Sequence, residues 1–179
     1  MDLPMLTVDK FVVDTNVLIS ANGTDPLIPR QCVISCINKL DLIKNSGKVV
    51  IDDTWEVLTE YRNNVGSVNG GGVGTQFLLY IFSNQGNSNS VELGKITKNA
   101  SGSYVEYPSD PVLAPFDPSD KKFVALCALD PQNSVIVQAT DTDFWEYENP
   151  MARSGINISF ICDPYINQLA HRKNMTQIP

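Results

Sequence analysis

Five acidic residues are the side chains of this sequence best suited to chemistry. They are Asp14, Glu60, Asp120, Asp141 and Asp143. Carboxylate oxygens are the ligands that Mg²⁺ and Mn²⁺ prefer. Carboxylates that meet at short range raise one another's pKa unless a cation neutralises them. If the fold gathers these acids, they form a divalent-metal site that can activate water and stabilise charge on a phosphate.

Taken singly, each acid also has a structural explanation. Asp14 can begin a turn, and Glu60 can lie on a solvated helix face. Asp120 can complement a helix dipole, which contributes about 0.3 to 1 kcal/mol. Asp141 and Asp143 can shape a turn through side-chain hydrogen bonds to the backbone. The metal site therefore depends on a fold that brings the acids to one place.

Composition restricts the other chemistries. The 179 residues include one histidine, His171, which excludes zinc sites that need two imidazoles. The four cysteines form no C-x-x-C pair and lie in apolar stretches, so we expect buried free thiols. These cysteines are Cys32, Cys36, Cys127 and Cys162.

The charge balance limits the partners. There are 13 Lys and Arg against 20 Asp and Glu, a net charge of −7, so a polyanion needs bound cations or a local basic patch. Arg62, Lys121 and Lys122 adjoin the acids and are the candidate phosphate contacts.

No apolar run approaches about 18 residues, and the first residues lack a signal-peptide pattern. We expect a cytoplasmic protein with no membrane partner.

Alternating elements can position the acids. Strands are predicted at 11–13, 49–51, 134–139 and 158–162, and helices at 31–44, 54–64, 75–83, 119–129 and 165–172. An Asp53-x-x-Glu56 pattern begins the second helix, and Asp117 followed by Pro118 begins the fourth. This order predicts an α/β fold, a three-layer α/β/α sandwich with a central, mainly parallel sheet.

The segment 66–115 interrupts the alternation. It is rich in Gly, Ser, Asn and Pro, so outside the helix at 75–83 we expect a long irregular insertion, with room for a small hairpin, in a single domain 1–179. Its glycine cluster at 70–74 matches no phosphate-binding loop and is interpreted as a connector. A lid, a substrate-selecting loop and a dimer contact are the roles open to this insertion.

Ligands of parallel sheets bind at the carboxyl ends of the strands. The first predicted strand ends at Asp14, and the strand 134–139 is followed by Asp141 and Asp143. Glu60 and Asp120 lie on helices that neighbour these strands in the chain. We therefore expect the acids to converge at this edge of the sheet.

Four segments resemble, in order, motifs of the PIN-domain ribonucleases. They are FVVDTN at 11–16, VVID with TEYR at 49–52 and 59–62, DKKFVAL at 120–126 and TDTDF at 140–144. The set spans residues 11 to 144, and the family order makes it more specific than any single motif.

The resemblance implies a PIN-like, Rossmann-like fold and a metal-dependent endoribonuclease that leaves 5′-phosphate and 3′-hydroxyl ends. It implies that Mg²⁺ or Mn²⁺ is bound by catalytic Asp14, Glu60, Asp120 and Asp141, with Asp143 as a further ligand and Asn16 and Thr140 as polar neighbours. A toxin with an RNA substrate and an antitoxin partner is one form of this activity. A homodimer is the default assembly, because two-fold oligomers are the commonest.

Two other functions stay open at this point. The acidic surface and the long insertion also suit a catalytically silent PIN-like module that binds nucleic acid or acts as a scaffold. A phosphatase of the haloacid-dehalogenase type would use Asp14 as nucleophile. That class needs a second acid where this sequence has Asn16, and a later G-D-x-x-x-D element that is absent.

Overall fold

The computed structural model describes residues 9–65 and 71–176. Of the predicted connector at 70–74, residue 70 lies outside these residues, as do residues 1–8 of the predicted non-signal N-terminus. No helix in the described ranges is both long and apolar enough to cross a membrane.

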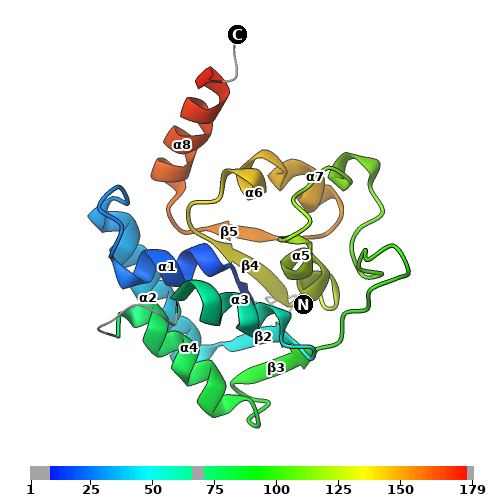
Figure 1. Ribbon diagram of the computed structural model, residues 1–179, viewed down its shortest axis with the longest axis horizontal. Coiled ribbons are helices and arrows are strands. Elements are labelled where there is room, and N and C mark those ends of the chain that lie inside the picture. Colours follow the sequence, from blue (N-terminus) through cyan, green and yellow to red (C-terminus); the bar gives the residue numbers. More distant parts are fainter. Residues whose placement is uncertain (1–8, 66–70, 177–179) are drawn as a thin grey trace, which may run out of the picture.

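A five-stranded sheet forms the centre of the fold, in the order β3-β2-β1-β4-β5, with every pairing parallel. The strands are β1 Lys10–Val13, β2 Lys48–Asp52, β3 Val91–Gly94, β4 Ser134–Gln138 and β5 Ile158–Phe160. Strands β3 and β5 lie at opposite edges, and helices flank the sheet on both sides (Figure 1). The predicted three-layer α/β/α architecture is confirmed.

The helices form two groups. They are α1 Thr15–Asn22, α2 Arg30–Ser46, α3 Glu56–Val65, α4 Val73–Asn84, α5 Lys121–Ala128, α6 Thr142–Glu146, α7 Glu148–Arg153 and α8 Asp163–Thr176, with a 3-10 turn at Pro111–Leu113. Helices α1 to α4 pack on one another, whereas α5 packs on β1, β2 and β4, and α6 contacts α7 and α8. The short helices α1, α6 and α7 were not among the predicted helices, because none is long enough to show a sustained apolar period.

The central strands are buried on both faces, as their apolar runs predict. Val12 and Val13 of β1 and Ile136 and Val137 of β4 are all buried. Val13 is in register with Val137, and the Asp14 backbone N–H donates to the Val137 carbonyl at 3.0 Å. The residues that follow these two strands therefore leave the sheet at the same level.

Helix α3 begins at Glu56 and is capped by Asp52, not by the predicted Asp53. The Asp52 carboxylate accepts from the backbone N–H groups of Glu56 and Val57, each at 2.8 Å. It also accepts from the Thr54 hydroxyl at 2.6 Å. As the last residue of β2, Asp52 is buried and directed at the helix start, which spacing along the chain did not distinguish from Asp53.

Helix α5 begins at Lys121, two residues later than predicted. Asp117 accepts from the Ser119 backbone N–H and hydroxyl, both at 2.8 Å, and so shapes a turn before the helix. Asp120 then directly precedes the helix, and its carboxylate accepts no capping hydrogen bond. The shift leaves the Asp120 side chain available for other contacts.

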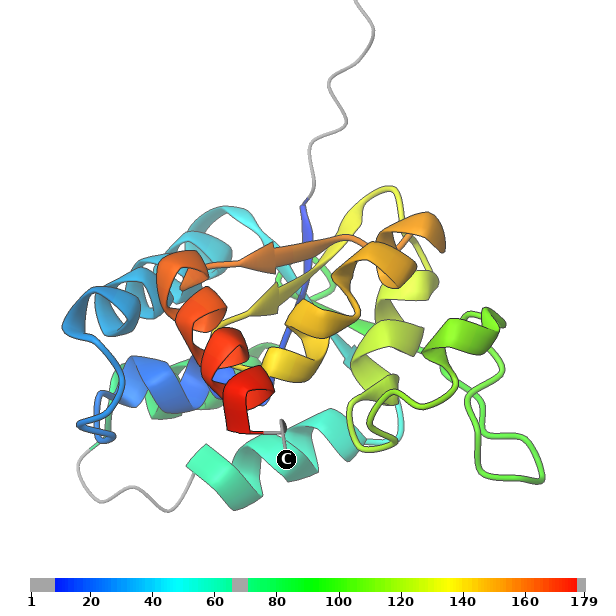
Figure 2. The same cartoon turned by 90° about the horizontal axis from the view of Figure 1, so that it is seen from above.

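The segment 66–115 is more regular than predicted. Strand β3 pairs with β2 and completes the sheet, and α4 packs closely on α1, where a Cβ on Gly74 would lie 2.0 Å from the Leu18 carbonyl oxygen. After Gly94 the chain is irregular, and Lys98 and Tyr104 form an antiparallel bridge as in the expected small hairpin. Figure 2 shows this loop between β3 and α5 extending to one side of the sheet.

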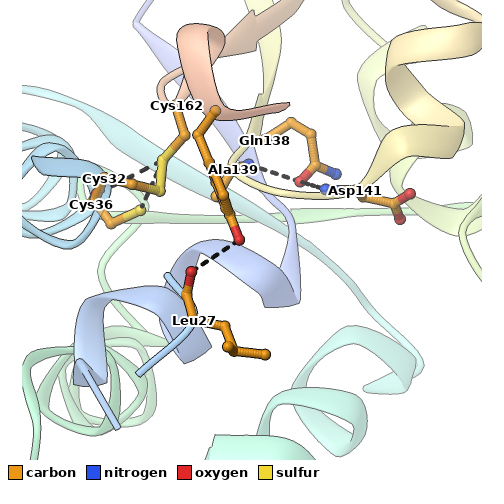
Figure 3. Close-up of a disulfide and its surroundings, with 8 residues drawn as sticks. Leu27, Cys32, Cys36, Gln138, Ala139, Asp141 and Cys162 are labelled. Carbon is orange, nitrogen blue, oxygen red and sulfur yellow. Dashed lines mark hydrogen bonds between the residues drawn. A yellow bond between two sulfur atoms is a disulfide. The ribbon is translucent and has the colours of Figure 1, made fainter. Parts of the chain in front are cut away.

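The prediction that all four cysteines are free is wrong. Cys32 of α2 and Cys162 before α8 form a disulfide across 130 residues of sequence (Figure 3). Cys36 and Cys127 are free and buried, and Cys36 Sγ lies 3.9 Å from Cys162 Sγ. The pairing depends on the packing of distant elements, which cysteine spacing does not report. Since disulfides are typical of oxidising compartments, the cytoplasmic location stays a prediction.

Reduction of this disulfide should lower the free energy of unfolding by about 2–4 kcal/mol, because the bond restricts the unfolded chain over a long loop. Urea denaturation with and without dithiothreitol measures the change. The double variant Cys32→Ser, Cys162→Ser should be insensitive to reductant, and Cys127→Ser should keep the sensitivity. Equal midpoints for wild type in both conditions would contradict the prediction.

Candidate functional site

Three of the five predicted acids meet at the carboxyl edge of the sheet. Asp14, Asp120 and Asp141 each offer a carboxylate oxygen, and these oxygens all lie within 4.8 Å of one another. Asp14 follows β1, Asp141 follows β4 and Asp120 precedes α5. We call these three residues the acid triplet.

Helix starts hold two members of the triplet. Asp14 caps α1 by accepting from the Asn16 backbone N–H at 2.8 Å, and it is only 2% exposed. Asp141 caps α6 in the same way, by accepting from the Asp143 backbone N–H at 2.8 Å. Each of these hydrogen bonds is accepted by Oδ1, which leaves the second oxygen of each carboxylate without a capping bond.

No ion pair neutralises the acid triplet within the described part of the chain. Among the ion pairs of those residues, none includes Asp14, Asp120 or Asp141. Burial raises the pKa of Asp14 well above its ordinary range, and the charges of Asp120 and Asp141 raise it further. Burial, followed by the charge of Asp141, raises the pKa of Asp120 to about 7. Burial also raises the pKa of Asp141, against the hydrogen bond from Asp143.

Glu60 lies beside the triplet but is engaged elsewhere. Its carboxylate forms an ion pair with Lys122 and accepts a hydrogen bond from the Thr15 hydroxyl. Lys122 is buried and also donates to the Ser119 carbonyl. Glu60 still acts on the triplet through its charge, which raises the pKa of Asp14. The predicted fourth ligand thus has its own counter-ion.

Asp143 is also outside the triplet. Its carboxylate pairs with Lys173 of α8 at 2.5 Å, and the same ammonium lies 3.3 Å from Glu146. Its backbone N–H donates to the Asp141 carboxylate, and its charge raises the pKa of Asp141.

The remaining predicted site residues are dispersed. Asn16 and Thr140 are half-buried next to Asp14 and Asp141 in the chain. Lys121 donates to the Ala114 carbonyl at 2.8 Å and lies 4.9 Å from the ring centroid of Tyr107. Arg62 is exposed and lines a separate cavity. Of the predicted phosphate contacts, only Lys122 touches a predicted acid.

Three supporting residues were not predicted from the sequence. Gln138 accepts from the backbone N–H groups of Ala139 at 2.7 Å and Asp141 at 3.4 Å, and so shapes the turn that carries Asp141 (Figure 3). Buried Tyr61 donates to the Val13 carbonyl at the end of β1, and Thr15 orients Glu60. A polar residue within an apolar run was the available signal for Gln138; the partners of Tyr61 and Thr15 are distant in sequence.

The chemistry of the triplet fits a hard divalent cation. All its donors are carboxylate oxygens, which Mg²⁺ and Mn²⁺ accept together with water, and it offers none of the nitrogen or sulfur ligands typical of structural zinc. Burial disfavours the ionised acids, and the charges of Lys122 near Asp120 and Lys173 near Asp141 oppose this only in part. A bound cation would remove that conflict.

Comparisons with protein-family models, curated proteins and solved structures found no match to this chain. The functional assignment therefore depends on the site geometry and on the motifs of the sequence.

Without metal, the acid triplet should make stability fall as pH rises. Between its ordinary pKa of 3.8 and the raised value of about 7, Asp120 keeps a proton in the folded state that the unfolded state has lost, so raising the pH favours unfolding. Urea denaturation in EDTA across this range tests the effect. Asp120→Asn should reduce the slope, and Mn²⁺ should restore stability to wild type above pH 7. Parallel profiles for wild type and Asp120→Asn would contradict it.

Proposed function

We propose that this chain is a metal-dependent endoribonuclease with a PIN-like active site that hydrolyses phosphodiester bonds in RNA. One observation carries the proposal: Asp14, Asp120 and Asp141 are brought within 4.8 Å at the carboxyl edge of a parallel sheet, with no ion-pair partner among the described residues. The order of the PIN-like motifs along the sequence supports the ribonuclease class over other metal-dependent hydrolases.

The triplet would hold Mg²⁺ or Mn²⁺ through its free carboxylate oxygens. When bound, the ion supplies an activated water and neutralises charge on the scissile phosphate and the leaving oxygen. The capping bonds from Asn16 and Asp143 orient Asp14 and Asp141, and Thr15 and Lys122 hold Glu60 at the rim. Water attack at phosphorus with release of the 3′ oxygen gives a 5′-phosphate and a 3′-hydroxyl.

From the sequence resemblance we also propose a cellular role, a partner protein and an assembly. A cytoplasmic toxin held in check by an antitoxin protein is the form we propose, with a homodimer as its assembly. With a net charge of −7, the protein needs a bound cation or a local basic patch where RNA approaches its surface.

A catalytically silent PIN-like module is the second candidate. The observation that favours it is the Glu60–Lys122 ion pair, which occupies one of the acids that the resemblance assigns to the metal. A module of this kind would keep the fold and bind nucleic acid or protein without cleavage.

Cleavage of a fluorescently labelled single-stranded RNA in Mn²⁺, Mg²⁺ or EDTA tests the leading proposal. We expect metal-dependent cleavage that falls at least about 100-fold in Asp14→Asn and in Asp141→Asn, because each substitution removes a charged metal ligand. Asp41→Asn, an equal charge change at an exposed position of α2, should retain activity.

The outcomes separate the two candidates. Cleavage that persists in both site variants would show that the triplet is not the active site. Folded protein that cleaves no single-stranded RNA in either metal would favour the silent module.

A further inference from the structure

Two surface cavities lie along α3 and share Trp55 in their walls. The larger, of about 630 Å³, is lined by the Glu60–Lys122 ion pair and by Ser119, the residue before Asp120, but by no member of the acid triplet itself. The smaller, of about 390 Å³, is lined by Arg62 and Phe82. Trp55 and Thr59 border both cavities and form the boundary between them.

Trp55 has an unusual backbone conformation. Its φ of 66° is the only positive φ of a non-glycine residue in the described ranges, and such a conformation costs about 1–3 kcal/mol. The hydrogen bonds from Thr54 and Glu56 to Asp52 fix the chain on both sides of it. The fold thus keeps a bulky residue where glycine would fit without strain.

The Trp55 side chain is not one of the buried core residues. It is 40% exposed, and within the described part of the chain its ring has no stacked or edge-on contact with another aromatic ring. Part of the Trp55 side chain is therefore open to solvent at the border of the two cavities.

The surroundings of Trp55 suit a single nucleic acid strand. Phe82 is 43% exposed in the smaller cavity, and exposed Arg62 has no ion pair with a described residue. The larger cavity adds the exposed amide of Asn63. Aromatic faces stack on unpaired bases, and arginine contacts phosphates. In duplex RNA the bases are already stacked and paired, so their faces are closed to Trp55.

We propose that Trp55 stacks on a base of single-stranded RNA that runs from the acid triplet through the larger cavity and into the smaller one, where Arg62 contacts a phosphate. This inference rests on the proposed ribonuclease function and adds the form of its substrate: an unpaired strand bound on the α3 side of the triplet. Trp55 is a binding residue here and takes no part in the chemical step.

Binding in EDTA tests this site apart from cleavage. The chain has two tryptophans, so a Trp145→Phe background leaves Trp55 as the single fluorophore. A single-stranded RNA should quench its emission. In fluorescence anisotropy, Trp55→Ala should weaken binding by about 5- to 150-fold, the range that base stacking gives per base.

Matched variants exclude a purely structural role. Trp55→Phe should keep most of the binding. Trp55→Gly should lose binding as Trp55→Ala does, while its unfolding midpoint in urea rises, because glycine adopts the positive φ freely. Leu79→Ala, an exposed apolar change on the same helix as Phe82 but outside both cavities, should bind RNA like the parent protein. Duplex RNA of the same sequence should show no dependence on Trp55.

The proposed function and this inference can fail separately. Trp55-dependent binding without cleavage in Mn²⁺ would support the stacking site and remove the nuclease. Metal-dependent cleavage with equal binding and equal KM in wild type and Trp55→Ala would overturn the stacking site and keep the nuclease. A Trp55→Gly variant that lost RNA binding and also unfolded at a lower urea concentration than wild type would overturn it as well.

Discussion

The burial of three carboxylates at one edge of the sheet is the constraint around which the site is built. Strands β1 and β4 are adjacent and in register, and the turn held by Gln138 after β4 carries Asp141 to the edge at which Asp14 leaves β1. Burying a charge without a partner is costly, and capping bonds from Asn16 and Asp143 offset only part of that cost. The remaining conflict appears as raised pKa values, and a divalent cation is its simplest resolution.

The distribution of cations around the site strengthens this interpretation. Glu60 pairs with Lys122, Asp143 with Lys173 and Glu56 with Lys98 at 2.8 Å. These acids around the triplet thus have basic partners, whereas the triplet has none among the described residues. In each of these pairs a lysine neutralises the charge of the neighbouring carboxylate. Their absence at Asp14, Asp120 and Asp141 leaves room for a ligand.

The middle of the chain contributes a wall to the site. Strand β3 extends the sheet beyond β2, and the loop that follows brings Lys98 and Tyr104 to α3, where both contact Glu56 at 2.8 Å. The larger cavity lies between this loop, α3 and the start of α5. The segment expected to be an irregular insertion therefore shapes the surface that we assign to RNA.

The sequence by itself determined the type and order of most elements, because apolar periods and turn residues act over a few positions. That order was enough to place Asp14 and Asp141 at one edge. Only the tertiary structure decided that, of the other expected acids, Asp120 joins them while Glu60 and Asp143 pair with Lys122 and Lys173. The bond between Cys32 and Cys162 was likewise decided only there. These choices depend on distances between side chains tens of residues apart, which packing fixes and sequence spacing does not encode.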